Sequence, residues 1–527
     1  MRHQSAARLI LATAILIGLG LRVVAVSGKI TLTHDEGISY LAATGHQAEY
    51  TQADRDRSYP VGTWVPASEW KRFIRPDKFL CFGKIASDLA EYDYHPPLFF
   101  WVLHVWVSLF GVSMWSGTLL NVLFFLLAIA VTFRLAGHVL GDPLEAAVLA
   151  ALWVMSPFAL HVTTEVRQYE LLGLLSLVLM WAAIRYVETR GGGGPKELIA
   201  IFLVGLAGAL TQHYFALVAL GTCVLVTFTL FKSAKLAWFK FHLALAAAYA
   251  LFLLTFPALE QQSRARAVES EPFGIASAFG RLKTAATTVP QFLVHARVGD
   301  ALLVLVTVVL ALAVLAILWK RPWVGERGGA GGGEGAKYAL FFLVWNLGSL
   351  IALFVAGASP SYAMAAKYFA FVWPLFGLVP VLASRLLGAR WRPALLIGLC
   401  VWQALYGALF AAVTLNRVRG RTHPSTLLNA ADGVLVDSVS RGVLPRVFFM
   451  MRDDGVIFAE RQKNLIADEG RWLGELPENG VYVSNLDYGN TVEQRAAIRA
   501  RIGERRRVDT VECGMYNFDF ARFSPPR

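Results

Sequence analysis

The chain has 527 residues, of which 56% are hydrophobic and only 16% are charged, and its formal net charge is +12. A mean hydropathy of +0.51, with repeated apolar runs of membrane-spanning length, excludes an ordinary soluble domain and indicates a polytopic membrane protein. Most lysines and arginines stand in short loops between these runs, so membrane orientation explains the positive charge better than nucleic-acid binding does.

The first apolar run begins at Leu9, directly after the basic residues Arg2 and Arg8. We interpret it as an uncleaved membrane helix whose N-terminus lies in the cytoplasm. The alternative is a signal peptide cleaved near Ser27, but the mature chain would then start just before an acidic cluster that has the character of a functional site.

Ten further apolar runs have about the length needed to cross a hydrocarbon core of about 30 Å. They cover residues 115–133, 144–160, 170–187, 197–212, 213–231, 241–257, 300–319, 337–356, 368–384 and 393–413. Together with the first run they predict a mostly α-helical membrane protein with about eleven transmembrane helices and additional juxtamembrane helices.

The run at 97–111 is shorter than the others and follows the sequence "HPP". It carries His104 and Ser108 one helical turn apart, and its tryptophans Trp101 and Trp106 are suited to the headgroup level. We interpret this run as a helix that lies in the plane of the membrane with its tryptophans toward lipid.

Alternate short loops differ strongly in basic content. The loops at 185–197, 232–240, 320–337 and 385–392 are rich in basic residues, whereas those at 161–169, 211–213 and 357–367 hold only Arg167 and Lys367. The positive-inside rule places the first set in the cytoplasm. From a cytoplasmic N-terminus, this parity requires that 97–111 does not cross. The sequence therefore predicts large external loops at 28–114 and 258–299, and an external C-terminus.

The part of the chain after residue 415 loses the long apolar runs. Short β-type stretches such as "GVLVDSV" and "GVYVSNL" alternate there with helical patterns. We therefore predict a transmembrane catalytic domain over 1–415 and a small external α/β domain over 416–527. The glycine-rich stretches at 191–194 and 328–335 are interpreted as spacers, because neither has a phosphate-binding pattern.

The four cysteines are too few and too scattered for a zinc site. Cys223 and Cys400 fall inside predicted spans and are expected to be small core residues. Cys81 and Cys513 are both external in this topology, which leaves open a disulfide between the first external loop and the C-terminal domain.

Three polar clusters fall on the predicted external face. They comprise His34, Asp35 and Glu36; Glu91, Asp93 and His95; and Glu165, Arg167, Gln168, Tyr169 and Glu170. Membrane-protein loops are polar in any case, but carboxylates at a membrane face are costly to desolvate. The convergence of three clusters on one face favours an active site.

These clusters, with "LTQHYFALVAL" and "KYFAFVWPLFGLVP", resemble in order and spacing the polytopic glycosyltransferases of the GT-C fold. The similarity covers most of residues 30–385 and is greatest to the branch that contains protein O-mannosyltransferases and lipid A aminoarabinose transferases. It implies transfer of a sugar from a polyprenyl-phosphate carrier to a glycan, lipid or protein acceptor. The implied location is the non-cytoplasmic side of a membrane, with a bacterial inner membrane as the expected one.

The resemblance implies Asp35 as the base that deprotonates the acceptor hydroxyl, with Glu36 beside it as a second acid. His95 and Asp93 are expected to position the donor phosphate or a metal. A divalent metal stays open, with Glu36 and His95 as candidate ligands, because the loop at 161–169 lacks the Asp-x-Asp pattern of the family.

The remaining substrate-binding candidates carry charge, an aromatic ring or a histidine at the external ends of spans or in external loops. They are Glu165, Arg167, Tyr169, His213, Arg264, Arg266 and Lys367. Arg167 could either neutralise a phosphate or pair with Glu170 three residues later.

Two other classes of function are alternatives to a glycosyltransferase. A lipid-linked glycan transporter or flippase would also have many spans, but broken helices with charges at mid-membrane depth would be expected. A non-catalytic envelope assembly protein would have no need of acids at three places on one face. The sequence leaves the sugar and the acceptor open.

Overall fold

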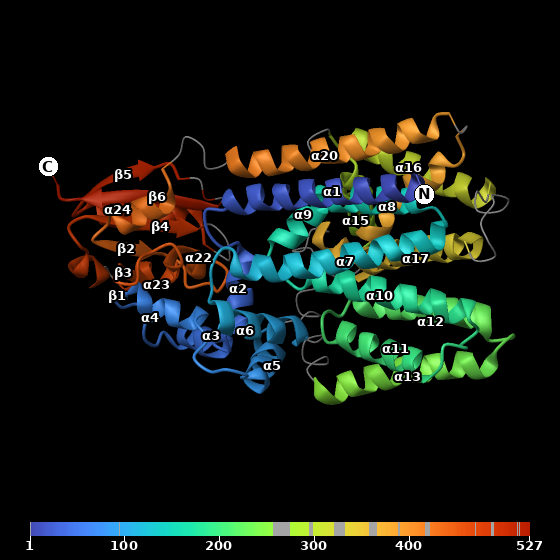
Figure 1. Ribbon diagram of the computed structural model, residues 1–527. Helices are drawn as coiled ribbons and strands as arrows, with labels where there is room; N and C mark the ends of the chain where they lie inside the picture. The colour runs from blue at the N-terminus through green and yellow to red at the C-terminus, as the bar shows by residue number, and fades with distance from the viewer. Residues whose placement is uncertain are drawn as a thin grey trace.

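The computed structural model describes most of the chain. The described residues are 2–93, 95–256, 274–294, 299–320, 332–357, 366–387, 390–416, 422–468, 471–485, 490–513, 515 and 517–526. They form an elongated helical bundle with a sheet-containing unit at one end (Figure 1). The N-terminus lies at the end of the bundle farthest from this unit (Figure 1).

Among the described residues, seven helices are long and apolar enough to cross a membrane. They are α1 (Arg2–Ser27), α7 (Ser116–Leu140), α10 (Tyr169–Glu188), α13 (Lys235–Thr255), α16 (Asp300–Lys320), α17 (Gly332–Gly357) and α20 (Arg392–Asn416). An eighth candidate is the pair α8 (Pro143–Val154) and α9 (Pro157–Thr164), bent by 57°. The bend falls at Ser156, which caps α9, and at Pro157, which has no backbone N–H to continue α8.

Three predicted spans form shorter helices. Residues 197–212 and 213–231 correspond to α11 (Pro195–Ala209) and α12 (Phe215–Leu230). Residues 368–384 hold α18 (Trp373–Phe376) and α19 (Leu378–Ser384), after the 3₁₀ turn η4 (Ala366–Phe369). The mostly helical membrane fold is thus confirmed, while the number of eleven spans stays a prediction.

Helix α6 (Leu98–Phe110) has 13 residues, about 20 Å at 1.5 Å per residue, and is too short to cross the membrane. It lies with α2 (His34–Ala43) and α5 (Phe82–Tyr92) near the sheet-containing unit (Figure 1). Its tryptophans were expected to face lipid, but both are half-buried, because their indole N–H groups donate to protein carbonyls. The exposed apolar side chains are instead Leu109 and Phe110, at 64% and 63%.

The region predicted as an external loop at 258–299 is partly helical. It contains α15 (Ile275–Thr288) and the 3₁₀ turn η2 (Val289–Phe292), which pack against α16. The backbone carbonyl of Phe292 accepts a hydrogen bond from Gln403 of α20 at 2.9 Å. The predicted loop at 258–299 thus contains a helical segment that is anchored to the bundle, and its external location stays a prediction.

The first external loop forms α2 (His34–Ala43), α3 (Gln47–Asp56), β1 (Val65–Pro66), α4 (Ala67–Lys71), η1 (Arg72–Ile74) and α5 (Phe82–Tyr92). The C-terminal region forms strands β2 (Gly433–Val436), β3 (Val456–Ala459), β4 (Gly480–Asn485), β5 (Arg507–Val511) and β6 (Phe518–Ser524). Between them run α21 (Pro424–Asn429), α22 (Leu444–Phe448), α23 (Gln462–Ala467), η5 (Arg471–Glu475) and α24 (Val492–Gly503).

One six-stranded sheet joins these two regions. Its strand order is β1-β3-β2-β4-β6-β5, and β1 of the first loop pairs antiparallel with β3. Trp70 of α4 stacks on Phe448 of α22 with ring centroids 6.5 Å apart. The first loop and the C-terminal region therefore form one packed unit, although the proposed domain division at 415/416 separates them in sequence.

Strands β3, β2 and β4 are neighbours and run parallel. Side chains of both β2 and β4 are buried along their whole length, as is usual for strands covered on both faces. Because the strands are parallel, the loops that follow them leave the sheet at one common edge.

The four cysteines are free thiols. Cys81 lies at the start of α5, where its Sγ is 3.7 Å from Nε2 of His104, and Cys513 pairs its backbone with Thr422. The disulfide that the sequence left open is therefore not formed, since each cysteine is held by different neighbours.

Gly442 allows α2 to approach the C-terminal unit closely. A Cβ atom there would lie 1.9 Å from Cδ2 of His34, which is too close for any side chain. We expect Gly442→Ala to lower the free energy of unfolding by about 1–3 kcal/mol through overpacking. Gly474→Ala is the matched control, since nothing lies within 4 Å of its Cβ position. Equal thermal unfolding of the two variants would contradict the close packing.

Candidate active site

Asp35 stands in the first turn of α2, directly after the chain leaves α1. Thr33 caps this helix, and its hydroxyl accepts a hydrogen bond from the backbone N–H of Glu36. The sequence Thr-His-Asp-Glu is a capping-box pattern, so the local sequence itself starts the helix here and fixes the position of Asp35.

Asp35 lies between two cations that come from distant parts of the chain. Its Oδ2 atom contacts Nζ of Lys367, on η4, and lies 3.7 Å from Nε of Arg167, in the turn between α9 and α10. Its Oδ1 atom is 2.9 Å from Nδ1 of His34. The side chain of Asp35 is 17% exposed, so solvent or a ligand can still reach it.

The charges around Asp35 set its protonation. Burial alone would raise the pKa of Asp35, but Arg167, the hydrogen bond from His34 and Lys367 together hold it well below its usual range. Burial likewise opposes the charge of Lys367, yet Glu165, with its Oε1 atom 3.9 Å away, and Asp35 raise the pKa of that ammonium group. Asp35 and Lys367 are thus ionised together.

Arg167 also joins Asp35 to the second acidic cluster. Its Nη2 atom is 3.5 Å from Nε2 of His95, whose Nδ1 atom is 2.5 Å from Oδ1 of Asp93. Burial would raise the pKa of Asp93, but His95, then Arg441 and Arg167 hold it well below its usual range. The structure therefore brings together Asp35, Arg167, His95 and Asp93, as the sequence predicted from topology.

Aromatic side chains line the other side of Lys367. Its Nζ atom lies 5.7 Å from the ring centroid of Tyr169, a distance at which a cation and a ring attract each other. Tyr169 and Tyr214 each pack edge-on against Tyr368, with centroids 6.0 and 5.7 Å apart. Of these three rings, only Tyr169 was predicted from the sequence.

Glu36, predicted as a second acid or metal ligand, is 1% exposed and already bound on all sides. Its carboxylate accepts hydrogen bonds from Nζ of Lys29 at 2.5 Å and from the backbone N–H groups of Thr33 and Val166 at 2.7 and 3.1 Å. Lys29 also donates to the carbonyl of Thr164. Glu36 therefore ties the end of α1 to the turn that carries Arg167.

We expect Glu36→Gln to act mainly on stability. Removing one partner of a buried ion pair costs about 3–5 kcal/mol, so the unfolding temperature in detergent should fall clearly. Glu91→Gln, at an exposed position of α5, is the matched control. Turnover per folded molecule should fall less than in a variant of Asp35. A stable but inactive Glu36→Gln protein would assign Glu36 to the chemistry instead.

Arg167 and Glu170 belong to different contacts in the structure. Glu170 accepts a hydrogen bond from the hydroxyl of Thr163 at 3.1 Å, and Arg22 of α1 donates to the same hydroxyl at 3.2 Å. Arg167 contacts Asp35 and His95 instead. Arg167 thus faces the acidic site, where it can meet a phosphate, and Glu170 belongs to a separate buried contact inside the bundle.

The other candidates are placed as follows. His213 lies between α11 and α12, where its ring packs edge-on against Phe252. Arg264 and Arg266 lie outside the described residues. Across the described part of the chain, no group of three His, Cys, Asp or Glu side chains converges as a metal site. Glu36 and His95, the candidate ligands, each bind protein groups, and the divalent metal stays a prediction.

The sequence missed Arg441, which follows β2 in the C-terminal region. Its Nη1 atom donates to the carbonyl of Tyr92 at 2.5 Å and lies 3.7 Å from Oδ2 of Asp93. No sequence signal marks this contact, because it depends on how the C-terminal unit packs against the first loop. The C-terminal region therefore takes part in the candidate site.

The family comparison matches part of the chain. Residues 94–259 match the family model described as dolichyl-phosphate-mannose-protein mannosyltransferase. This range includes His95, Glu165, Arg167 and Tyr169. No curated protein matches the chain.

Among solved structures, the chain is similar to ArnT from Cupriavidus metallidurans. The structure bound to undecaprenyl phosphate is 12% identical, with a TM-score of 0.48 and coverage of 98% of this chain and 99% of that one. The structure in the apo state is 14% identical, with a TM-score of 0.47 and coverage of 98% of both chains.

Proposed function

We propose that this chain, a membrane glycosyltransferase by its family match over residues 94–259, takes its sugar from a polyprenyl-phosphate carrier. The acceptor is a hydroxyl group on the non-cytoplasmic side of the membrane. The match confirms the resemblance to GT-C glycosyltransferases and favours an enzyme over a transporter or an assembly protein.

One observation carries the proposal: Asp35, Lys367 and Arg167 meet from three distant segments at the end of the bundle. A glycosyl transfer from a lipid phosphate needs a base for the acceptor hydroxyl and positive charge for the leaving phosphate. A carboxylate between two cations supplies both kinds of group in one place.

The chemistry balances with these residues alone. The acceptor oxygen attacks the anomeric carbon and its proton passes to Asp35, while the bond from that carbon to the phosphate oxygen breaks. The polyprenyl phosphate leaves with one more negative charge, which Lys367 and Arg167 neutralise. No step requires a metal.

The ion pairs also explain how Asp35 gains basicity at the right moment. In the free enzyme both cations contact Asp35, and this makes it a weak base. An incoming phosphate competes for Lys367 and Arg167, so the pKa of Asp35 rises when the donor is bound. Donor binding thereby makes Asp35 a stronger base.

A transfer assay tests the proposed function directly. The full chain in lipid nanodiscs is given undecaprenyl-phosphate-linked sugars carrying a radiolabel, with envelope glycolipids or glycans as acceptors. We expect release of undecaprenyl phosphate together with a labelled acceptor. The donor assignment is wrong if no sugar leaves the lipid with any acceptor, or if the enzyme transfers sugar only from nucleotide-linked donors.

The orientation is a separate proposal. Arg385 of the 385–392 loop contacts Glu145 at the start of α8 at 2.5 Å, and His138 contacts Glu188 at the ends of α7 and α10 at 2.7 Å. These basic loops therefore gather at the end of the bundle away from Asp35. Together with the positive-inside rule, this supports a site on the non-cytoplasmic side, and a bacterial inner membrane is the membrane we propose.

We expect reporter fusions at residue 330 to report the cytoplasm and fusions after residue 420 to report the external side. The reason is that the basic loops and the candidate site lie at opposite ends of the bundle. Paired phosphatase and fluorescent-protein reporters at each position provide the internal control. A cytoplasmic signal after residue 420 would reverse the orientation and exclude an external active site.

A further inference from the structure

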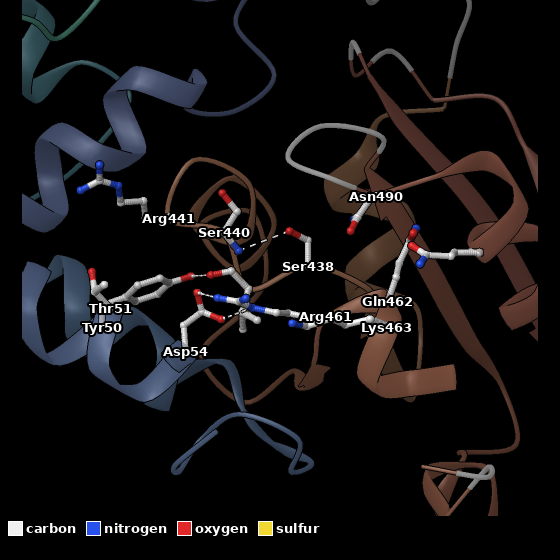
Figure 2. A pocket seen from close by; sticks show the side chains of 12 residues that line it. Tyr50, Thr51, Asp54, Ser438, Ser440, Arg441, Arg461, Gln462, Lys463 and Asn490 are labelled. Atoms are coloured by element: carbon white, nitrogen blue, oxygen red, sulfur yellow. Dashed lines mark hydrogen bonds and ion pairs between the residues drawn. The ribbon is translucent and has the colours of Figure 1, made fainter. Parts of the chain in front are cut away.

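A polar crevice lies between α3 of the first loop and the C-terminal unit, and the reaction does not use it directly. Its volume is about 500 Å³, within the range of small-molecule sites. It is lined by Tyr50, Thr51, Asp54, Ser438, Val439, Ser440, Arg441, Arg461, Gln462, Lys463, Asn490 and Gln494. Figure 2 shows these side chains converging from the helices of the first loop and from the loops of the sheet.

The crevice stands where the sheet would bind a ligand. Ser438 and Ser440 follow β2, Gln462 follows β3, and Asn490 follows β4, and these three strands are parallel neighbours. Strand β3 lies on one side of β2 and β4 on the other, so the strand order reverses at β2. Ligands of open α/β sheets bind at such a reversal, outside the carboxyl ends of the strands.

A buried carboxylate fixes this edge. Asp437, at the end of β2, accepts hydrogen bonds from Gln462 at 2.5 Å, Tyr482 at 2.7 Å and Ser484 at 2.6 Å. Oε1 of Gln462 in turn accepts from the backbone N–H of Thr491, one residue after Asn490. Gln462 after β3 and Thr491 after β4 are thus held beside the end of β2 before any ligand arrives.

The charge in the crevice is positive. Arg461 binds Asp54 through two hydrogen bonds of 2.7 Å each, which balances those two residues. Lys463 is exposed on the rim, whereas Arg441, on the side toward α5, is paired with Asp93 at 3.7 Å. Hydroxyl and amide groups make up most of the remaining lining. A ligand of matching chemistry carries an anionic group and several hydroxyls, as a phosphorylated or acidic sugar does.

The crevice is also connected to the candidate active site. Arg441 lines it and reaches Asp93, which contacts His95, which contacts Arg167 and so Asp35. In Figure 2 the side chain of Arg441 points away from Arg461, toward the helices of the first loop. Most of the lining residues carry a hydroxyl, amide or charged group at the end of the side chain, which suits a water-soluble headgroup.

We propose that this crevice is a second binding site of the enzyme, which takes the anionic, hydroxyl-rich headgroup of the acceptor. That this headgroup belongs to the acceptor rests on the proposed function, whereas the binding of such a headgroup to the crevice does not. Arg441, which lines the crevice and is paired with Asp93, connects this second site to the candidate active site.

Binding is measured by titration calorimetry on the full chain in nanodiscs, without donor. The probes are glucose 1-phosphate, glucose and inorganic phosphate. We expect glucose 1-phosphate to bind more tightly than either of the other two. Lys463→Gln should weaken it by about tenfold, as expected for loss of one charged hydrogen bond. Gln494→Ala should weaken it less, and Lys84→Gln, an exposed lysine of α5 outside the crevice, should leave it unchanged.

Several results would overturn the proposal. They are no binding of glucose 1-phosphate, equal binding of inorganic phosphate, or equal weakening by Lys84→Gln, which would indicate general attraction to positive charge. Competition by undecaprenyl phosphate in the nanodisc would assign the crevice to the donor. Because no sugar is transferred in this experiment, an inactive enzyme that still binds the probe refutes only the proposed reaction.

Discussion

Asp35→Asn is expected to lower the turnover of sugar transfer by about 100- to 10,000-fold, the contribution of a positioned base, while the protein stays folded. The amide keeps the size of the side chain and its hydrogen bond to His34 but cannot accept the acceptor's proton. Donor binding should be kept, because Lys367 and Arg167 remain. The measurement is kcat in the nanodisc assay, with thermal unfolding in parallel.

Asp77→Asn is the matched control, since Asp77 is an exposed aspartate of the first loop that also pairs with a histidine, His46. It should transfer at the rate of the unchanged protein. A well-folded Asp35→Asn enzyme of near-normal turnover, beside an inactive Glu165→Gln or Asp93→Asn enzyme, would move the base to one of those residues.

Lys367→Met should lower turnover by about 100- to 1,000-fold, because the charge that develops on the leaving phosphate loses a preorganised partner. The pH dependence provides a second readout. With both cations present, the pKa of Asp35 lies well below its usual range, so Asp35 stays ionised as the pH falls through the mildly acidic range. Without Lys367, burial pushes that pKa upward, and the acidic limb of kcat/KM should move to higher pH.

Lys367→Arg separates charge from packing, since it keeps the positive charge and should recover part of the rate and the acidic limb of the unchanged enzyme. Lys84→Gln is the surface control. If Lys367→Met lowers stability but leaves both the rate and the pH profile per folded molecule unchanged, Lys367 only holds the bundle together.

The sequence predicts the main site because helix ends are readable from hydropathy. Asp35, Arg167 and Lys367 each stand where an apolar run meets the same face of the membrane, so topology alone brings them near one another. The sequence predicts the roles of the individual residues in this cluster less well than their positions. Glu36 was assigned to the chemistry, although Thr33 three residues earlier forms a capping box with it and could have shown its structural part.

Other features depend on tertiary contacts that leave no local pattern. The bend between α8 and α9 could have been read from Ser156 and Pro157, but the pairing of β1 could not, because two residues show no alternation. Arg441 contacts Asp93 only because the C-terminal unit packs against the first loop. The carbonyl partners of the two α6 tryptophans likewise lie in other segments, which the pattern of the run does not show.

The pairing of β1 with β3 also sets an order of events during synthesis. Strand β1 is made early, and its partner follows about 390 residues later, which takes about 20–80 s at a translation rate of about 5–20 residues per second. The first loop must wait through the insertion of nearly all the membrane helices before its sheet is complete. Arg441, which reaches Asp93, arrives at the same late stage. If translation stops while the membrane helices are being made, the released protein therefore contains Asp35 but lacks strand β3 and Arg441.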